Sequence, residues 1–480
     1  MNSLPLFQPS PRTFPAIPTQ EVEIQGPPPA PARPTSSLAV VILPLIFMLI
    51  GLGLSVAFIG NNPSYLLLSV PLMLGSGLVG IITYSNERKK YHQAVERRQQ
   101  AFHAYLADVY RTLQDLAEQQ RCASMEIHPN FATCLAIARR AHPDDARHLW
   151  ERSSGLGRPR DPDFLHLRLG TGRLPSTFKV KPPATRPQVG EADELYERAV
   201  QLARDFQHVD NVAIALPLSQ VGSAGLAGPR SSVLDTTRAL LVYTATLHPP
   251  NEVKIVALFP NRERHEWEWL RWLPHVWDDE RKRRYLATSP DQAQQMLTEL
   301  FPLLQKRALS RGSFADDKTT FPQTYLFIFG DPALSTSSTD TSVIGPLTHL
   351  LLTQGASIGA YSLFLSDRVE ALPGACGAVV DLSSASGRLL FSSGYQTVEL
   401  LFSPDRLDAA HAEGFARTLA PVRLKSMAAK ADLPSRVSLL NLFKAKTVAD
   451  IPVVTWWKQR DSHRSLEVPL GIEAGGESCI

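Results

Sequence analysis

The sequence has few cysteines, and their positions exclude two kinds of site. Its 480 residues include four of them, Cys122, Cys134, Cys376 and Cys479. No two share a C-x-x-C spacing, so the chain offers neither a zinc ligand set nor a disulfide framework. Such sparse cysteine use fits a reducing compartment. We expect no metal site.

A strong net charge and the common hydrolase motifs are also missing. The formal net charge is only +3, which is too small to indicate a nucleic-acid partner. No G-x-S-x-G segment occurs, and the stretch from His265 reads H-E-W-E-W rather than the H-E-x-x-H of zinc proteases. We therefore interpret His248, His265 and His275 as packing or surface residues.

The P-loop pattern G-x-x-x-x-G-K-[ST] is absent from the sequence. The nearest segment is 222–232, which lies between an apolar run and a helical pattern, as a phosphate-binding loop does. Its glycines Gly222 and Gly228 are separated by five residues. Pro229 removes one backbone N–H, and Arg230 stands where lysine is expected.

A second partial match lies at Asp331, which follows Gly330 and the apolar run 325–329. An Asp after a buried strand can orient magnesium in P-loop proteins, but no Glu follows here to act as a base. We interpret the two segments together as a degenerate nucleotide-binding site without catalytic residues. Its candidate residues are Gly222, Gly225, Gly228, Arg230, Ser231 and Asp331.

Two long uncharged runs are present near the start of the chain. Residues 38–59 form an uncharged stretch of 22 residues, and residues 64–84 form a second one after the polar turn 60–63. A helix of about 20 apolar residues covers the hydrocarbon core of a bilayer. Two such runs in succession argue against a core helix and against a signal peptide. We predict a transmembrane hairpin at 37–85.

Basic residues set the orientation of this hairpin. Arg88, Lys89 and Lys90 follow the second run directly, whereas the turn between the runs carries no charge. The positive-inside rule therefore places both ends of the hairpin in the cytoplasm, together with the bulk of the chain.

Two segments of different character flank the hairpin. Residues 1–36 are rich in Pro, Ser and Thr, and this composition predicts a disordered or extended tail. Between 87 and 120 apolar residues recur every three or four positions without Gly or Pro, which predicts a helical stalk. The apolar stripe could pack on the same chain or on another subunit. We assign 86–190 to the stalk and its connector.

In residues 191–425, apolar runs alternate with helical patterns, which predicts an α/β domain with a mostly parallel sheet. We expect this domain to be a degenerate P-loop or RecA-like fold. The expected helices are 231–247, 290–306 and 343–353. The expected strands are 211–216, 253–259, 325–329, 357–365, 378–382, 389–392 and 397–402.

Several sequence blocks resemble one family. The block 266–275, E-W-E-W-L-R-W-L-P-H, is similar to the W-x-W-x-x-W-L-P-H block of the EccC/EssC membrane ATPases of type VII (ESX) secretion, which belong to the FtsK/SpoIIIE class. L-W-E-R at 149–152 and D-P-D-F-L-H-L-R-L-G-T-G at 161–172 resemble another family segment. Residues 433–440 and 466–471 resemble the stretch that leads into the first ATPase module, so we assign 426–480 to this lead-in.

The resemblance implies several properties that the residues alone do not. Family members lie in the bacterial inner membrane with other type VII secretion subunits, form hexamers, and export WXG100-type substrates. They use ATP and magnesium in modules that would follow Ile480, so the motor is expected on a separate polypeptide or lost by truncation. The tail resembles the EccC branch more than the EssC branch.

The leading hypothesis is thus a membrane-anchored, non-catalytic platform subunit of a type VII secretion translocase. Two alternatives stay open: a nucleotide-binding enzyme component that uses the loop 222–232, and the membrane part of an FtsK-like DNA translocase.

Overall fold

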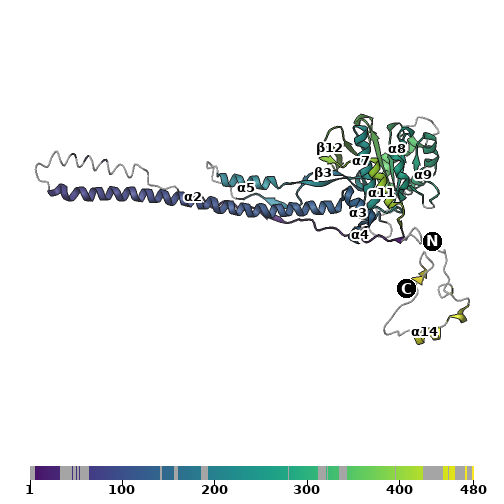
Figure 1. The fold of residues 1–480 in the computed structure, drawn as a ribbon, viewed down its shortest axis with the longest axis horizontal. Coiled ribbons are helices and arrows are strands. Elements are labelled where there is room, and N and C mark those ends of the chain that lie inside the picture. Colours follow the sequence, from purple (N-terminus) through teal and green to yellow (C-terminus); the bar gives the residue numbers. More distant parts are fainter. Residues whose placement is uncertain are drawn as a thin grey trace. The chain divides into compact units, whose positions relative to one another are not determined.

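The structure is a computed structural model and describes most of the chain (Figure 1). The described residues are 6–32, 64–140, 143–155, 160–184, 193–278, 281–311, 323–334, 343–394, 396–424, 447–451, 453–459 and a few isolated positions. They divide into two compact units. Unit 1 comprises 1–16, 121–174 and 210–480, and unit 2 comprises 17–120 and 175–209. The predicted boundary at 190/191 differs from this division, because residues 121–174 group with the α/β domain.

The centre of unit 1 is a ten-stranded mixed sheet in the order β5-β3-β13-β12-β11-β6-β10-β9-β7-β8. Its strands are β3 (His166–Pro175), β5 (His208–Pro217), β6 (Ser223–Ala227), β7 (Val253–Leu258), β8 (Leu286–Ala287), β9 (Thr324–Phe329), β10 (Ala360–Ser366), β11 (Ala378–Asp381), β12 (Gly387–Ser393) and β13 (Gln396–Pro404). From β11 to β8 all neighbours are parallel, whereas β12 and β13 run antiparallel to their neighbours. The expected α/β domain with a mostly parallel sheet is confirmed.

The two faces of this sheet carry separate apolar clusters. Along β9, Leu326 and Ile328 belong to one cluster, and Phe327 and Phe329 belong to the other. This alternation follows from the two-residue period of a strand that is buried on both faces. The first cluster includes side chains of α7 (Arg230–Leu247) and α11 (Ala409–Leu419), and the second includes those of α9 (Pro290–Arg311) and α10 (Ile344–Gln354).

Short elements complete unit 1. The helices are α3 (Phe131–Arg139), α4 (Pro143–His148), α6 (Leu218–Val221), α8 (Arg264–Trp267) and α14 (Val453–Gln459). The 3₁₀ turns are η1 (Asn261–Glu263), η2 (Glu268–Trp272), η3 (Pro274–Val276), η4 (Pro332–Leu334), η5 (Gly355–Ile358), η6 (Val369–Ala371) and η7 (Val448–Asp450). Two-residue strands lie at β14 (Arg423–Leu424), β15 (Gly471–Ile472) and β16 (Ser478–Cys479).

The block 266–275, which contains three tryptophans, packs into the core of unit 1. Trp267 and Trp269 are each 2% exposed, and the Trp267 ring stacks on Phe259 with 5.4 Å between centroids. His248 and His275 are also fully buried, and the His275 Nε2 atom lies 2.7 Å from the carbonyl oxygen of His248. Their interpretation as packing residues is confirmed.

Unit 2 is built on α2 (Ser64–Ile127), whose residues up to 120 belong to it, and on α5 (Glu194–Asp205). Figure 1 shows α2 as one continuous helix. The predicted stalk helix is confirmed: it continues directly from the second uncharged run, 64–84, and it ends at Ile127, beyond the predicted limit of 120. Part of its apolar stripe packs within the chain, since Phe102 shares a core with Leu195 and Ala199 of α5.

The N-terminal residues 6–32 have defined positions and include two extended strands, where composition predicted a disordered or extended tail. In unit 1, β1 (Leu6–Phe7) pairs in parallel with β14. In unit 2, β2 (Glu21–Glu23) pairs in parallel with β4 (Lys179–Lys181), and Ile24 is 1% exposed. A Pro-rich segment needs no core of its own when it takes hydrogen-bond partners from strands already in place, which composition alone does not reveal.

The transmembrane hairpin stays a prediction. Within the described part of the chain, no helix is both long enough and apolar enough to cross a membrane. The first predicted span, 38–59, lies outside the described residues except at three single positions. For the second span, 64–84, the helical backbone is described, but the side chains up to residue 81 are not.

Candidate functional site

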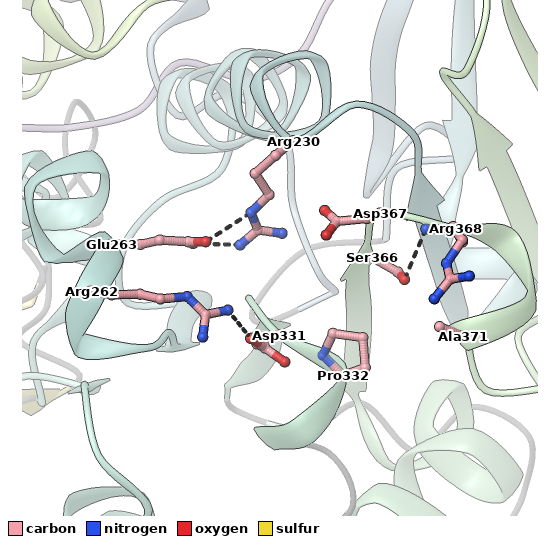
Figure 2. A pocket seen from close by; sticks show the side chains of 9 residues that line it. All are labelled: Arg230, Arg262, Glu263, Asp331, Pro332, Ser366, Asp367, Arg368 and Ala371. Carbon is pink, nitrogen blue, oxygen red and sulfur yellow. Dashed lines mark hydrogen bonds and ion pairs between the residues drawn. The ribbon is translucent and has the colours of Figure 1, made fainter.

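A cavity of about 360 Å³ opens at the carboxyl ends of parallel strands in unit 1 (Figure 2). β6, β9 and β10 end at Ala227, Phe329 and Ser366, and the residues that follow them contribute to the lining. In open α/β sheets, ligands bind at this edge. The lining residues are Arg230, Arg262, Glu263, Asp331, Pro332, Ser366, Asp367, Arg368 and Ala371.

Arg230 is the first residue of α7, and its guanidinium points into the cavity (Figure 2). Its Nε donates a hydrogen bond of 3.0 Å to Glu263 Oε1, and its Nη2 pairs with the second oxygen of the same carboxylate. Nη2 also donates to the carbonyl oxygen of Gly330 at 2.5 Å. Arg230 therefore occupies the position expected for a P-loop lysine, but its charge is already neutralised by a carboxylate.

The Asp331 carboxylate is likewise already paired with a side chain of opposite charge. Its Oδ2 accepts a hydrogen bond of 2.6 Å from Arg262, and its Oδ1 accepts one of 2.9 Å from the backbone N–H of Ala333. A magnesium ion at Asp331 would have to compete with the Arg262 guanidinium for this carboxylate. The Arg262 side chain is 71% exposed, so water screens the ion pair and its strength is modest.

The third part of the cavity wall follows β10. Ser366 Oγ accepts a hydrogen bond of 3.2 Å from the backbone N–H of Arg368, and Figure 2 shows the carboxylate of Asp367 on the side that faces Arg230. The lining thus holds three arginines and three carboxylates. Its formal charge is balanced, whereas a polyphosphate site needs an excess of positive charge.

The predicted loop 222–232 differs from the structure. Residues 223–227 form β6, a fully buried strand between β10 and β11, so the connection to α7 is only Gly228 and Pro229. Two residues leave no room for a loop that wraps a phosphate. The sequence S-A-G-L-A contains no run of large apolar residues, and for this reason the strand was not predicted.

The six predicted site residues therefore separate into two groups. Arg230 and Asp331 line the same cavity, and Ser231 is exposed next to Arg230 on α7. The three glycines do not line the cavity; they lie in β6 or next to it, at positions where the backbone conformation or a close neighbour disfavours a side chain. Gly222 precedes β6 with φ of +77°, and a Cβ on Gly225 would lie 2.4 Å from Leu372 Cδ1. Gly228 has φ of +144°, and a Cβ there would lie 2.8 Å from the carbonyl carbon of Leu382.

Five polar lining residues were not predicted: Arg262, Glu263, Ser366, Asp367 and Arg368. Asp367 follows a buried strand, which is the signal that singled out Asp331, so the same rule applied to β10 would have found it. Arg262 and Glu263 lie in the 3₁₀ turn after β7 and match no motif. Only the fold brings them to Asp331 and Arg230.

A second polar cluster joins the sequence blocks at 149–152 and 161–172. The buried Arg152 guanidinium donates to the Tyr243 hydroxyl at 2.5 Å and to the carbonyl of Ile127 at 2.6 Å, and it pairs with Asp163 at 3.3 Å. Burial, together with the Arg152 charge, lowers the pKa of His128 well below its ordinary value. These contacts give the two blocks a packing role.

Among the described residues, no group of three or more His, Cys, Asp or Glu side chains is placed to hold a metal ion.

Comparison with known proteins identifies the relatives of this chain, although no family model matches it. The ESX secretion system protein EccC of Geobacillus thermodenitrificans is 25% identical over 470 residues, which are 98% of this chain and 30% of that protein. The type VII secretion system protein EssC of Staphylococcus aureus is 24% identical over 467 residues, 96% of this chain and 30% of that protein. The chain thus spans about a third of the length of these relatives.

Solved structures give a weaker likeness. Thermomonospora curvata EccC (ATPases 2 and 3), in complex with a signal sequence peptide, is 18% identical and covers 54% of this chain and 47% of that chain, with a TM-score of 0.33. Geobacillus thermodenitrificans EssC (ATPases 2 and 3) is 13% identical and covers 57% and 56%, with a TM-score of 0.32. The sequence matches confirm the predicted resemblance: over nearly its whole length, this chain is similar to the EccC and EssC proteins of type VII secretion.

Proposed function

We propose that this chain is a membrane-anchored, non-catalytic platform component of a type VII protein secretion translocase. The observation that carries the proposal is the match to EccC and EssC proteins over 96–98% of the chain, which covers only 30% of those relatives. The remaining length of the relatives leaves room for the ATPase modules. The chain would then supply the platform, and the motor modules would supply the force.

The geometry of the cavity supports a platform role without ATP hydrolysis. The turn between β6 and α7 is too short for a phosphate loop, Arg230 is paired with Glu263, and Asp331 is paired with Arg262. Transfer of a phosphoryl group depends on positioned cations and magnesium that neutralise the developing charge. In this cavity the corresponding charges neutralise each other instead.

Measuring ATP turnover by the purified full chain tests this role. We expect no magnesium-dependent release of phosphate above the buffer background. The matched variants are Asp331→Asn, which removes the magnesium ligand that the sequence predicted, and Arg173→Gln, which removes an arginine whose side chain is 59% exposed. Turnover that is abolished by Asp331→Asn and retained by Arg173→Gln would refute the proposal.

A second candidate function is nucleotide binding without turnover. The observation in its favour is the position of the cavity, at the carboxyl ends of β6, β9 and β10 and beside the first turn of α7. Titration calorimetry with millimolar ATP distinguishes the two candidates. Binding heat that disappears in Arg230→Ala supports a nucleotide site, and absence of heat rejects it.

The membrane anchor and the partners follow from the same proposal. Residues 37–85 would form the hairpin in the bacterial inner membrane, with both ends cytoplasmic. The partners would be the other type VII secretion subunits, further copies of this chain in a hexamer, separate ATPase modules and WXG100-type substrates.

Alkaline extraction of membranes tests the anchor: the full chain should stay in the pellet, and a variant lacking 37–85 should be released. Release of the full chain would exclude the anchor.

A further inference from the structure

Residues 6–14, here called the N-terminal strap, are attached to unit 1 at two points. At the first, Leu6 and Phe7 pair with Arg423 and Leu424 of β14. The Phe7 ring also meets the Trp150 ring edge-on, with 5.6 Å between centroids. These contacts place the start of the described chain beside the last strand of the α/β domain.

The second attachment is Arg12, which lies between two carboxylates. Its guanidinium pairs with Glu151 and with Asp163, and the three side chains are 3%, 4% and 9% exposed. Ion pairs with so little exposure are shielded from salt, and removal of one partner leaves a buried charge unpaired. Arg12 therefore holds the strap far more firmly than an exposed arginine would.

Strained backbone lies next to each of the two carboxylates. Trp150, directly before Glu151, has φ of +56°, and Leu165, two residues after Asp163, has φ of +52°. Large side chains rarely adopt this left-handed conformation, which persists only where surrounding contacts enforce it. The Trp150 ring is one of the groups that the strap covers, so strap closure helps to hold this strained segment.

Away from these two attachments the strap is weakly held. Gln8 and Pro11, between the attachments, are exposed, and so are Thr13 and Phe14 beyond Arg12, with Phe14 at 48%. By contrast, every residue of β9 and β10 is buried. Segments with few buried contacts open at a lower free energy than the core of a domain. β14 buries the Leu424 side chain, but it pairs with β1 in a sheet of only two strands, separate from the ten-stranded sheet. The strap and this two-stranded sheet are therefore expected to open at a lower free energy than β9 and β10.

We propose that residues 6–14 form a releasable strap that opens and closes together with β14 while the ten-stranded sheet stays folded. The strap closes when the Arg12 guanidinium pairs with the carboxylates of Glu151 and Asp163. β14 directly precedes the segment assigned to the lead-in, 426–480. Closure therefore ties the N-terminal segment to the end of the predicted α/β domain, 191–425. Release frees that end.

Hydrogen–deuterium exchange of the full chain in detergent tests the strap. In the wild type, amides of 6–14 and 423–424 should exchange at a common rate, at least about ten-fold faster than those of β9 and β10. Arg12→Gln should accelerate exchange a further ten-fold or so in these segments and in 148–154, with β9 and β10 unchanged. Arg173→Gln, which removes an exposed arginine 3.5 Å from Asp210, is the matched control and should leave the strap rate as it is.

A second variant keeps the test decisive if Arg12→Gln fails to fold. Phe7→Ala removes the contact with the Trp150 ring and leaves all charges in place, so it should accelerate exchange in the same segments by a smaller factor. Two results would overturn the proposal. One is a single exchange rate for the strap and the sheet in the wild type, and the other is a strap rate that neither variant changes.

Discussion

Gly228 is a residue for which the surrounding backbone excludes any side chain. It forms half of the turn between β6 and α7, and its φ of +144° is rarely adopted by residues with a Cβ. A Cβ would also lie 2.8 Å from the carbonyl carbon of Leu382, and backbone atoms cannot move aside as a side chain can. We expect Gly228→Ala to lower the free energy of unfolding by about 1–3 kcal/mol.

Denaturant unfolding of the full chain measures this loss. Gly374→Ala is the matched control, because a Cβ at Gly374 meets nothing within 4 Å. Equal stability of the two variants would contradict the steric argument.

His275 makes the stability of unit 1 depend on pH. Burial lowers the pKa of His275 to about 3, from an ordinary value near 6.5. Below pH 6.5 the unfolded chain binds a proton that the folded chain does not bind until about pH 3, so stability falls as the pH falls through this window. The slope from one such histidine is about 1.4 kcal/mol per pH unit.

Removing the imidazole removes this contribution. We expect the free energy of unfolding of His275→Gln to fall less steeply between pH 6 and pH 4 than that of the wild type, by about 1.4 kcal/mol per unit. Denaturant titrations at several pH values in this range check it. Parallel profiles for the two proteins would show that His275 is protonated in the folded state.

At the scale of elements, α9 contains an internal proline. Pro302 lies in the middle of the helix 290–311, where it removes one backbone hydrogen bond and its ring crowds the preceding turn. The residue is exposed, so no core packing depends on its ring. We expect Pro302→Ala to raise the free energy of unfolding, by up to about 3 kcal/mol.

Thermal unfolding monitored by circular dichroism checks this gain. Pro290→Ala is the control, because Pro290 is the first residue of α9, a position that tolerates proline. A lower stability of Pro302→Ala than of the wild type would contradict this argument, because it would mean that the proline stabilises the folded chain.

Elements with strong local signals were predictable, and those that depend on distant partners were not. β7 and β9 consist mostly of large apolar residues, and the predicted ranges 253–259 and 325–329 match them within one residue. β6 is made of small residues and is a strand only because β10 and β11 flank it. In the cavity, local rules found Arg230 and Asp331. Their ion-pair partners lie 33 and 69 residues away in sequence, beyond the reach of any spacing rule.

At the scale of the whole molecule, each compact unit has a core of its own. Unit 2 is centred on Ile24, Phe102 and buried residues of α5, and unit 1 is centred on the two faces of the sheet. A unit with its own core can lose its packing without unfolding its neighbour. Damage to the core of unit 2 should therefore leave the protection of the sheet intact.

Ala199→Glu places a charge at a position in α5 that is 0% exposed and packs in an apolar cluster with Ile24 and Phe102, where burial of a charge is costly. We expect hydrogen exchange to accelerate in 21–24, 98–113 and 194–205, while β9 and β10 keep their wild-type rates. Gln201→Glu is the matched control, because it introduces the same residue at an exposed position of the same helix. If exchange in β9 and β10 accelerated together with that in α5, the two units would unfold as one cooperative body.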